Sequence, residues 1–145
     1  MLNLYNLLKK ILNFTEFKKQ IEKGGVASLY LFLGEEDFIK KEALELLTEK
    51  LIQPGLESFN LNYSDAEETE ISDLINLAST FPVGADKRLV IVKETQKFEL
   101  AEKKQLSDFL PRIPKTTCLV LIAAELNEKE KFYEAVSNSG VIVEF

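Results

Sequence analysis

The sequence contains no histidine, and this absence excludes several common kinds of catalytic site. Without an imidazole, the chain cannot build a Ser-His or Cys-His pair, nor the usual zinc sites that include histidine. The single cysteine, Cys118, stands inside an apolar run, so a disulfide within the chain is excluded and a small buried core residue is expected there. A single cysteine also fits a reducing compartment.

Long apolar runs are missing as well. No run approaches the length of a membrane-spanning helix, and polar residues interrupt the leucine-rich start, which is unlike a secretory signal. We therefore expect a cytoplasmic protein without membrane contact. There is no excess of positive charge either, because 24 acidic residues outnumber 18 Lys and Arg and the formal net charge is −6. Binding to nucleic acid depends on Lys and Arg against phosphates, so a protein partner suits this chain better than direct contact with DNA.

What the chain does contain is a regular alternation of strand-like and helix-like segments. Four short apolar runs and one alternating segment predict five strands, at 29–33, 59–63, 89–92, 117–123 and 141–143. Amphipathic helical patterns separate them, which predicts an α/β fold with a five-stranded parallel sheet and helices on both faces. The leucine spacing over 4–12 predicts a further helix. We assign residues 1–13 to an N-terminal helical extension and residues 14–145 to the main domain.

The first apolar run ends at Gly34, where a phosphate-binding loop would begin. The pattern G-x-x-x-x-G-K-[ST], laid from Gly34, places its second glycine on Ile39, its lysine on Lys40 and its hydroxyl on Lys41. Ile39 restricts the backbone where glycine lets amides approach a phosphate, and Lys41 cannot hold magnesium. The acidic residues 35–37 would repel a triphosphate. Taken alone, the stretch fits an ordinary strand-to-helix turn equally well.

A second position expected to carry nucleotide chemistry is also changed. In a phosphate-loop ATPase the third strand ends in acidic residues that hold magnesium, but here residues 89–92 run into Lys93. The two changes together predict a nucleotide-binding architecture kept for its shape, with no cofactor and no metal. Two alternatives remain: an active nucleotide-binding ATPase, which positions 39, 41 and 93 disfavour, and a generic α/β regulatory domain of the receiver type. The latter needs an aspartate at a strand end, where Gly34, Lys93 and Ala123 stand.

The segment Phe81-Pro82-Val83-Gly84, which we call the 81–84 corner, is the remaining candidate site. Apolar residues at a helix end, stiffened by proline and followed by glycine, can form a wedge that enters a partner's pocket with little loss of conformational entropy. Alternatively, Phe81 and Val83 could simply cover the edge of the sheet. The segment alone favours this second explanation.

The order of four blocks of residues resembles the N-terminal domain of the delta subunit of bacterial DNA polymerase III. The blocks are Leu-Tyr-Leu-Phe-Leu-Gly-Glu-Glu-Asp-Phe at 29–38, Phe-Asn-Leu-Asn-Tyr at 59–63, Thr-Phe-Pro at 80–82 and Lys-Arg-Leu-Val-Ile-Val at 87–92. The likeness extends from about Phe14 to Phe145. It implies a P-loop NTPase (AAA+)-like domain with a degenerate nucleotide site, which is not itself an enzyme and works within the polymerase holoenzyme.

The same resemblance implies a function in DNA replication and a set of partners. Such a domain binds the beta sliding clamp and helps open it for loading on primed DNA, which it meets only through the assembled loader. The clamp contact falls on Phe81, Pro82, Val83 and Gly84, although Gly84 stands where the family often has a bulky, commonly aromatic residue. In the full-length protein a lid and a collar, both absent from this chain, join it to the gamma/tau and delta prime subunits. ATP hydrolysis belongs to other subunits.

Overall fold

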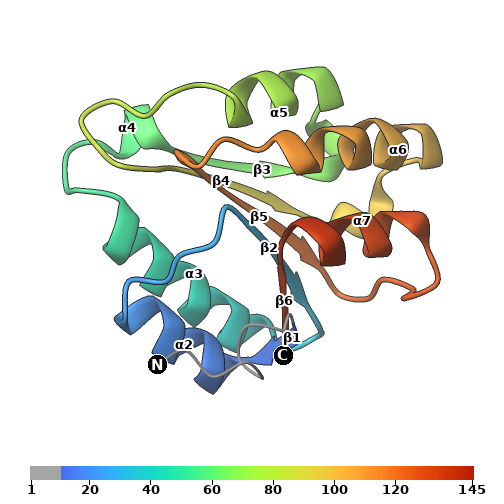
Figure 1. Ribbon diagram of the computed structural model, residues 1–145, viewed down its shortest axis with the longest axis horizontal. Coiled ribbons are helices and arrows are strands. Elements are labelled where there is room, and N and C mark those ends of the chain that lie inside the picture. The colour runs from blue at the N-terminus through green and yellow to red at the C-terminus, as the bar shows by residue number, and fades with distance from the viewer. Residues whose placement is uncertain (1–10) are drawn as a thin grey trace.

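The computed structural model describes residues 11–145, which form a parallel sheet between two layers of helices (Figure 1). The sheet order is β1-β6-β2-β5-β4-β3, and every neighbouring pair is parallel. The strands are β1 (Ile11–Asn13), β2 (Leu29–Leu33), β3 (Leu61–Asp65), β4 (Arg88–Lys93), β5 (Thr117–Ala123) and β6 (Val141–Glu144). The helices are α2 (Phe14–Glu22), α3 (Asp37–Leu51), α4 (Glu57–Asn60), α5 (Ile71–Ala78), α6 (Leu100–Phe109) and α7 (Lys131–Ser139).

The core lies on both faces of this sheet, because the inner residues of its central strands are apolar and buried. On one face, residues of α5, α6 and α7 pack against Leu31, Val90 and Leu121. On the other face, residues of α2 and α3 pack against an aromatic group in which the ring of Phe17 stands edge-on to those of Tyr30 and Phe32, each at 5.3 Å. A strand covered on both faces carries no polar alternation, which is the pattern that predicted β2, β4 and β5.

Burial also determines the chemistry of the single thiol. Cys118 lies fully buried in β5, as the sequence predicts, and its removal from water raises the pKa of the thiol from 9.0 to about 12. A neutral thiol is a poor nucleophile and a poor metal ligand. Among residues 11–145, no group of three or more acidic or cysteine side chains is placed to hold a metal ion, and no helix is long and apolar enough to cross a membrane.

The start of the chain corrects two sequence-based predictions. The sheet has six strands within the described residues, not five, because Ile11–Asn13 pairs with β6 at the sheet edge. The helix predicted over 4–12 is therefore wrong at residues 11 and 12, while its earlier part lies outside the described residues. Helix α2 begins directly after β1, where Asn13 is its N-cap and forms a reciprocal capping box with Glu16.

The segment around residue 60 is a third correction. The alternation over 59–63 predicted one strand, but the chain forms the short helix α4 first and enters β3 only at Leu61. The predicted position of this strand near the sheet edge is confirmed, since β3 is the last strand and pairs only with β4. The shift matters because it turns Asn60 inward, where its side chain is fully buried.

Candidate functional site

The loop after β2 is shorter than a phosphate-binding loop requires. Helix α3 begins at Asp37, so only residues 34–36 connect strand and helix. Ile39, Lys40 and Lys41 are already helical, and the N–H of Lys40 donates to the carbonyl of Glu36 at 3.1 Å. A phosphate loop instead leaves this backbone open, so that its amides surround the phosphate. The backbone of these residues instead forms the first turn of α3.

Gly34 is required by the protein's own backbone. Its φ is +134°, and a Cβ added there would lie 2.2 Å from the carbonyl oxygen of Phe145. The N–H of Gly34 donates to the carbonyl of Ala123 at 3.1 Å, while the N–H of Phe145 donates to the carbonyl of Leu33 at 2.8 Å. The absence of a side chain at position 34 therefore makes room for the segment after β6.

Lys40 occupies the lysine position of the phosphate-loop pattern but contacts the loop itself. The residue is buried, with 6% of its surface exposed, and its Nζ donates to the carbonyl of Gly34 at 2.7 Å. The same Nζ lies 3.1 Å from Oδ1 of Asp37, whose carboxylate is open to solvent. The ammonium thus has two partners within the protein, whereas Lys41 is an exposed residue.

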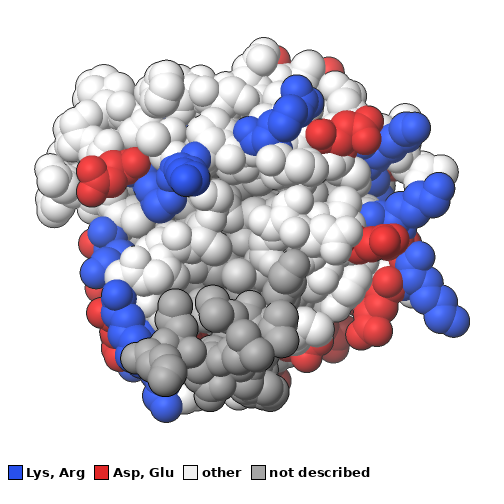
Figure 2. All heavy atoms as spheres, viewed as in Figure 1, with Lys and Arg blue, Asp and Glu red and all other residues white. Residues whose placement is uncertain are grey.

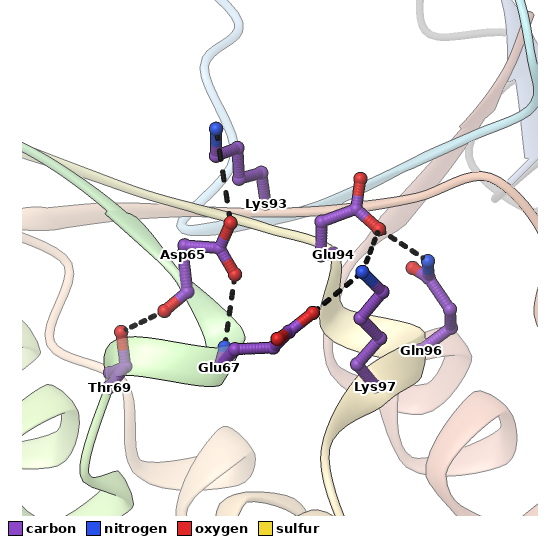
Figure 3. Close-up of polar contacts among 7 residues, drawn as sticks. All are labelled: Asp65, Glu67, Thr69, Lys93, Glu94, Gln96 and Lys97. Atoms are coloured by element: carbon purple, nitrogen blue, oxygen red, sulfur yellow. Dashed lines mark hydrogen bonds and ion pairs between the residues drawn. The ribbon is translucent and has the colours of Figure 1, made fainter.

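The carboxyl end of β4 carries a set of charged side chains that pair with one another (Figure 3). Lys93 stands opposite Asp65 in the register of β3 and β4, with Nζ 3.9 Å from Oδ2. Glu94 has a φ of +61°, and its Oε2 accepts a hydrogen bond from Nε2 of Gln96 at 2.8 Å. Lys97 donates to Glu67 at 2.6 Å, and this hydrogen bond is the main reason that the pKa of Lys97 is raised. These carboxylates are therefore already paired with cations or amides.

A pocket of about 660 Å³ brings three of the predicted positions together. It lies between α3 and the strands β3, β4 and β5, and its wall includes Lys40, Lys41 and Lys93. Gly34 and Ile39 are not in the wall. Four carboxylates also line the pocket, from Glu35, Asp37, Glu45 and Glu94, so that the three lysines give no net positive charge. A nucleoside triphosphate would experience little electrostatic attraction in this pocket.

The 81–84 corner follows α5 and presents apolar side chains to solvent. Phe81 is 75% exposed and Val83 is 51% exposed, whereas Pro82 is half-buried. This exposure favours the wedge prediction over the alternative that Phe81 and Val83 cover the sheet edge. Gly84 has a φ of +65°, a conformation that residues with side chains rarely adopt. This backbone geometry favours glycine at position 84.

Two buried polar side chains hold the corner in place. Asn60 is fully buried, and its side-chain amide forms two hydrogen bonds of 2.7 Å with Val83: it accepts from the N–H and donates to the carbonyl. Arg88, 6% exposed, donates from Nε to the carbonyl of Thr80 at 3.2 Å and from Nη1 to Oδ1 of Asn62 at 2.9 Å. Val83 is thereby fastened to α4, and Thr80, directly before the corner, is fastened to the first residue of β4.

Sequence reasoning did not assign Asn60 and Arg88 to the site. Asn60 fitted the polar phase of an alternating strand, which would have placed it outside, and its partner Val83 lies 23 residues further along the chain. Arg88 stood in a charged pair before a strand, where a solvated side chain is usual. The only available signal was an arginine directly next to a fully buried apolar run.

The fold defined by this sheet and these helices is that of clamp-loader proteins. A solved structure described as Bacillus subtilis DNA clamp loader delta protein superposes with a TM-score of 0.84 at 25% identity, over 91% of this chain and 42% of that chain. A gamma subunit-related protein of DNA polymerase III from Thermotoga maritima shares the fold with a TM-score of 0.63 at 15% identity, over 91% of this chain and 45% of that chain.

Comparison of the amino-acid sequence with known families shows which family the chain belongs to. The sequence model of the family described as DNA polymerase III, delta subunit, matches residues 30–145. The chain is also 28% identical over 137 residues to the DNA polymerase III subunit delta of Bacillus subtilis, a match that covers 87% of this chain. The chain belongs to the family of DNA polymerase III delta subunits. It spans 39% of the length of that Bacillus relative.

Proposed function

We propose that this chain is a non-catalytic module of a bacterial clamp loader, which binds the beta sliding clamp and helps open it for loading on primed DNA during replication. The observation that carries the proposal is the 81–84 corner, where Phe81 and Val83 are exposed on a segment fastened by Asn60 and Arg88. Exposed apolar side chains held in one conformation lose little entropy on binding, so they suit insertion into a partner's pocket.

The proposed module is AAA+-like with a degenerate nucleotide site, and it needs neither cofactor nor metal. The helical start of α3, the contact of Lys40 with Gly34 and the lysine at 93 support this assignment. The first two use, for internal contacts, backbone and ammonium groups that would otherwise meet phosphates, and Lys93 places a cation where an acidic residue would hold magnesium. In the proposed arrangement, ATP binding and hydrolysis are left to other subunits of the loader.

Membership of the delta family supports a wider set of proposals for the whole protein. Residues 14–145 form the clamp-binding domain, with residues 1–13 as an extension whose last three residues add β1 to the sheet. A lid and a collar outside this chain would join it to the gamma/tau and delta prime subunits. The complex would act in the cytoplasm and meet primed DNA only through the assembled loader.

Titration of this chain into the purified beta sliding clamp of the same organism tests the proposal. We expect saturable binding with a Kd in the micromolar range or tighter, which corresponds to about −8 kcal/mol, measured by isothermal titration calorimetry. Bovine serum albumin at the same concentration serves as the control for non-specific contact. A lack of binding at clamp concentrations of about 100 µM would contradict the proposed function.

The second candidate function, a nucleotide-binding ATPase, is favoured only by the pocket beside the Gly34 loop. We expect no binding of MgATP at about 1 mM, a concentration at which typical enzymes are near saturation. The variant Ile39→Gly/Lys41→Thr should be equally inactive, because Lys93 and the acidic loop remain. Fluorescent-nucleotide titration and a phosphate-release assay measure both properties, and turnover by either protein would favour the ATPase.

A further inference from the structure

Phe59 is a second exposed aromatic residue close to the 81–84 corner. It lies in the four-residue helix α4, directly before β3, and 53% of its surface is exposed. An aromatic side chain in water contributes little to folding, while aromatic residues are enriched where proteins bind each other.

The hydrogen bonds of Asn60 join the two segments. Asn60 is the neighbour of Phe59 in α4, and its side-chain amide holds both the N–H and the carbonyl of Val83 at 2.7 Å. A Cβ at Gly84 would lie 3.5 Å from Cδ1 of Leu56, so the residue before α4 also packs against the corner. The two segments therefore lie side by side and keep a fixed relative position (Figure 1).

The distribution of charge supports a single apolar surface. Residues 79–85 contain no charged side chain. In Figure 2, the region over α4 and the connection from α5 to β4, at the upper left, carries few charged atoms. By contrast, exposed Phe38 stands in α3 next to Asp37 and close to Lys40 and Lys41, so its surroundings are highly charged.

We propose that Phe59 belongs to the clamp-binding surface together with Phe81 and Val83, and this proposal rests on the proposed function. The partner is the same sliding clamp. Phe81 and Val83 enter its apolar pocket, and Phe59 packs on the apolar rim of that pocket. An aromatic contact beside the central anchors excludes water from them, which strengthens their contribution to binding.

Affinity measurements on single variants test this assignment. We expect Phe59→Ala to raise the Kd for the sliding clamp about tenfold, and Phe59→Asp to raise it further, because a carboxylate would be buried against apolar surface. The matched control is Phe38→Ala, which removes an equally large exposed ring at the start of α3. It should leave the Kd within about twofold. Circular dichroism melts verify that each variant folds, which is expected for substitutions at exposed positions.

The outcomes separate this inference from the function on which it rests. A loss of affinity in both Phe59 variants, with Phe38→Ala unchanged, supports the inference. If Phe81→Ala weakens binding but both Phe59 variants bind as the natural sequence does, the inference is overturned and the proposed function stands. An equal loss in Phe38→Ala also overturns it, because the effect would not be specific to this surface. If the natural sequence does not bind the clamp, both proposals are overturned.

Discussion

The double substitution Phe81→Ala/Val83→Ala should lower the affinity of this chain for the sliding clamp by about 100-fold, or about 2.7 kcal/mol. Both side chains are exposed in the free chain, so their removal takes away binding surface and leaves no cavity in the core. Truncated apolar anchors at the centre of an interface typically lose 2 kcal/mol or more in binding free energy. Calorimetric titration with purified clamp measures the difference.

The double variant has a matched control in α6, which follows the carboxyl end of β4, whereas the 81–84 corner precedes the amino end of that strand. Leu100, at the first position of α6, is 84% exposed, so Leu100→Ala removes a comparable apolar side chain far from the corner. We expect its affinity to stay within about twofold of the natural sequence. Unchanged binding by the double variant would mean that the clamp contacts another surface of the domain.

Gly34→Ala should lower the free energy of unfolding by about 4 kcal/mol, which would leave a marginally stable domain largely unfolded. Two effects add at this position. The φ of +134° is unfavourable for alanine, and the new Cβ would lie 2.2 Å from the carbonyl oxygen of Phe145. Phe145 cannot easily give way, because its N–H is bonded to Leu33 and its ring packs against Phe32 at 5.2 Å.

Gly24→Ala separates the two effects. Gly24 also has a positive φ, +81°, but nothing lies within 4 Å of the Cβ that alanine would add. The variant should therefore show only the backbone strain, about 1 kcal/mol. Urea denaturation followed by circular dichroism gives both values. Equal destabilisation by the two substitutions would mean that the contact with Phe145 contributes nothing.

Most of the sheet could be predicted from the sequence, because burial on both faces leaves a direct pattern. The inner residues of β2, β4 and β5 are apolar, and these strands were predicted within a few residues. The strand β1 could not be predicted, because three residues carry too little periodicity and Ile11 and Leu12 also fit a helical spacing. Its strand conformation comes from pairing with β6, more than 120 residues away in the sequence.

The candidate site could be predicted only in part, because some of its contacts join residues far apart in the sequence. The apolar character of the 81–84 corner is local, so the sequence could indicate it. The hydrogen bonds that fix it are not local: Asn60 reaches Val83 across 23 residues, and Arg88 reaches Asn62 across 26. The contact of Lys40 with Gly34 could not be predicted either. A departure from the phosphate-loop pattern does not indicate which group the lysine side chain contacts.

The hydrogen bonds that hold Val83 and Thr80 have a mechanical consequence. Val83 is tied to the residue that precedes β3, and Thr80 is tied to the first residue of β4. A force applied to Phe81 would therefore pass within a few residues into the sheet, whose strands are hydrogen-bonded to one another. A partner bound at this corner would therefore move together with the whole domain. The corner is held by hydrogen bonds, so it would not bend as a flexible loop does.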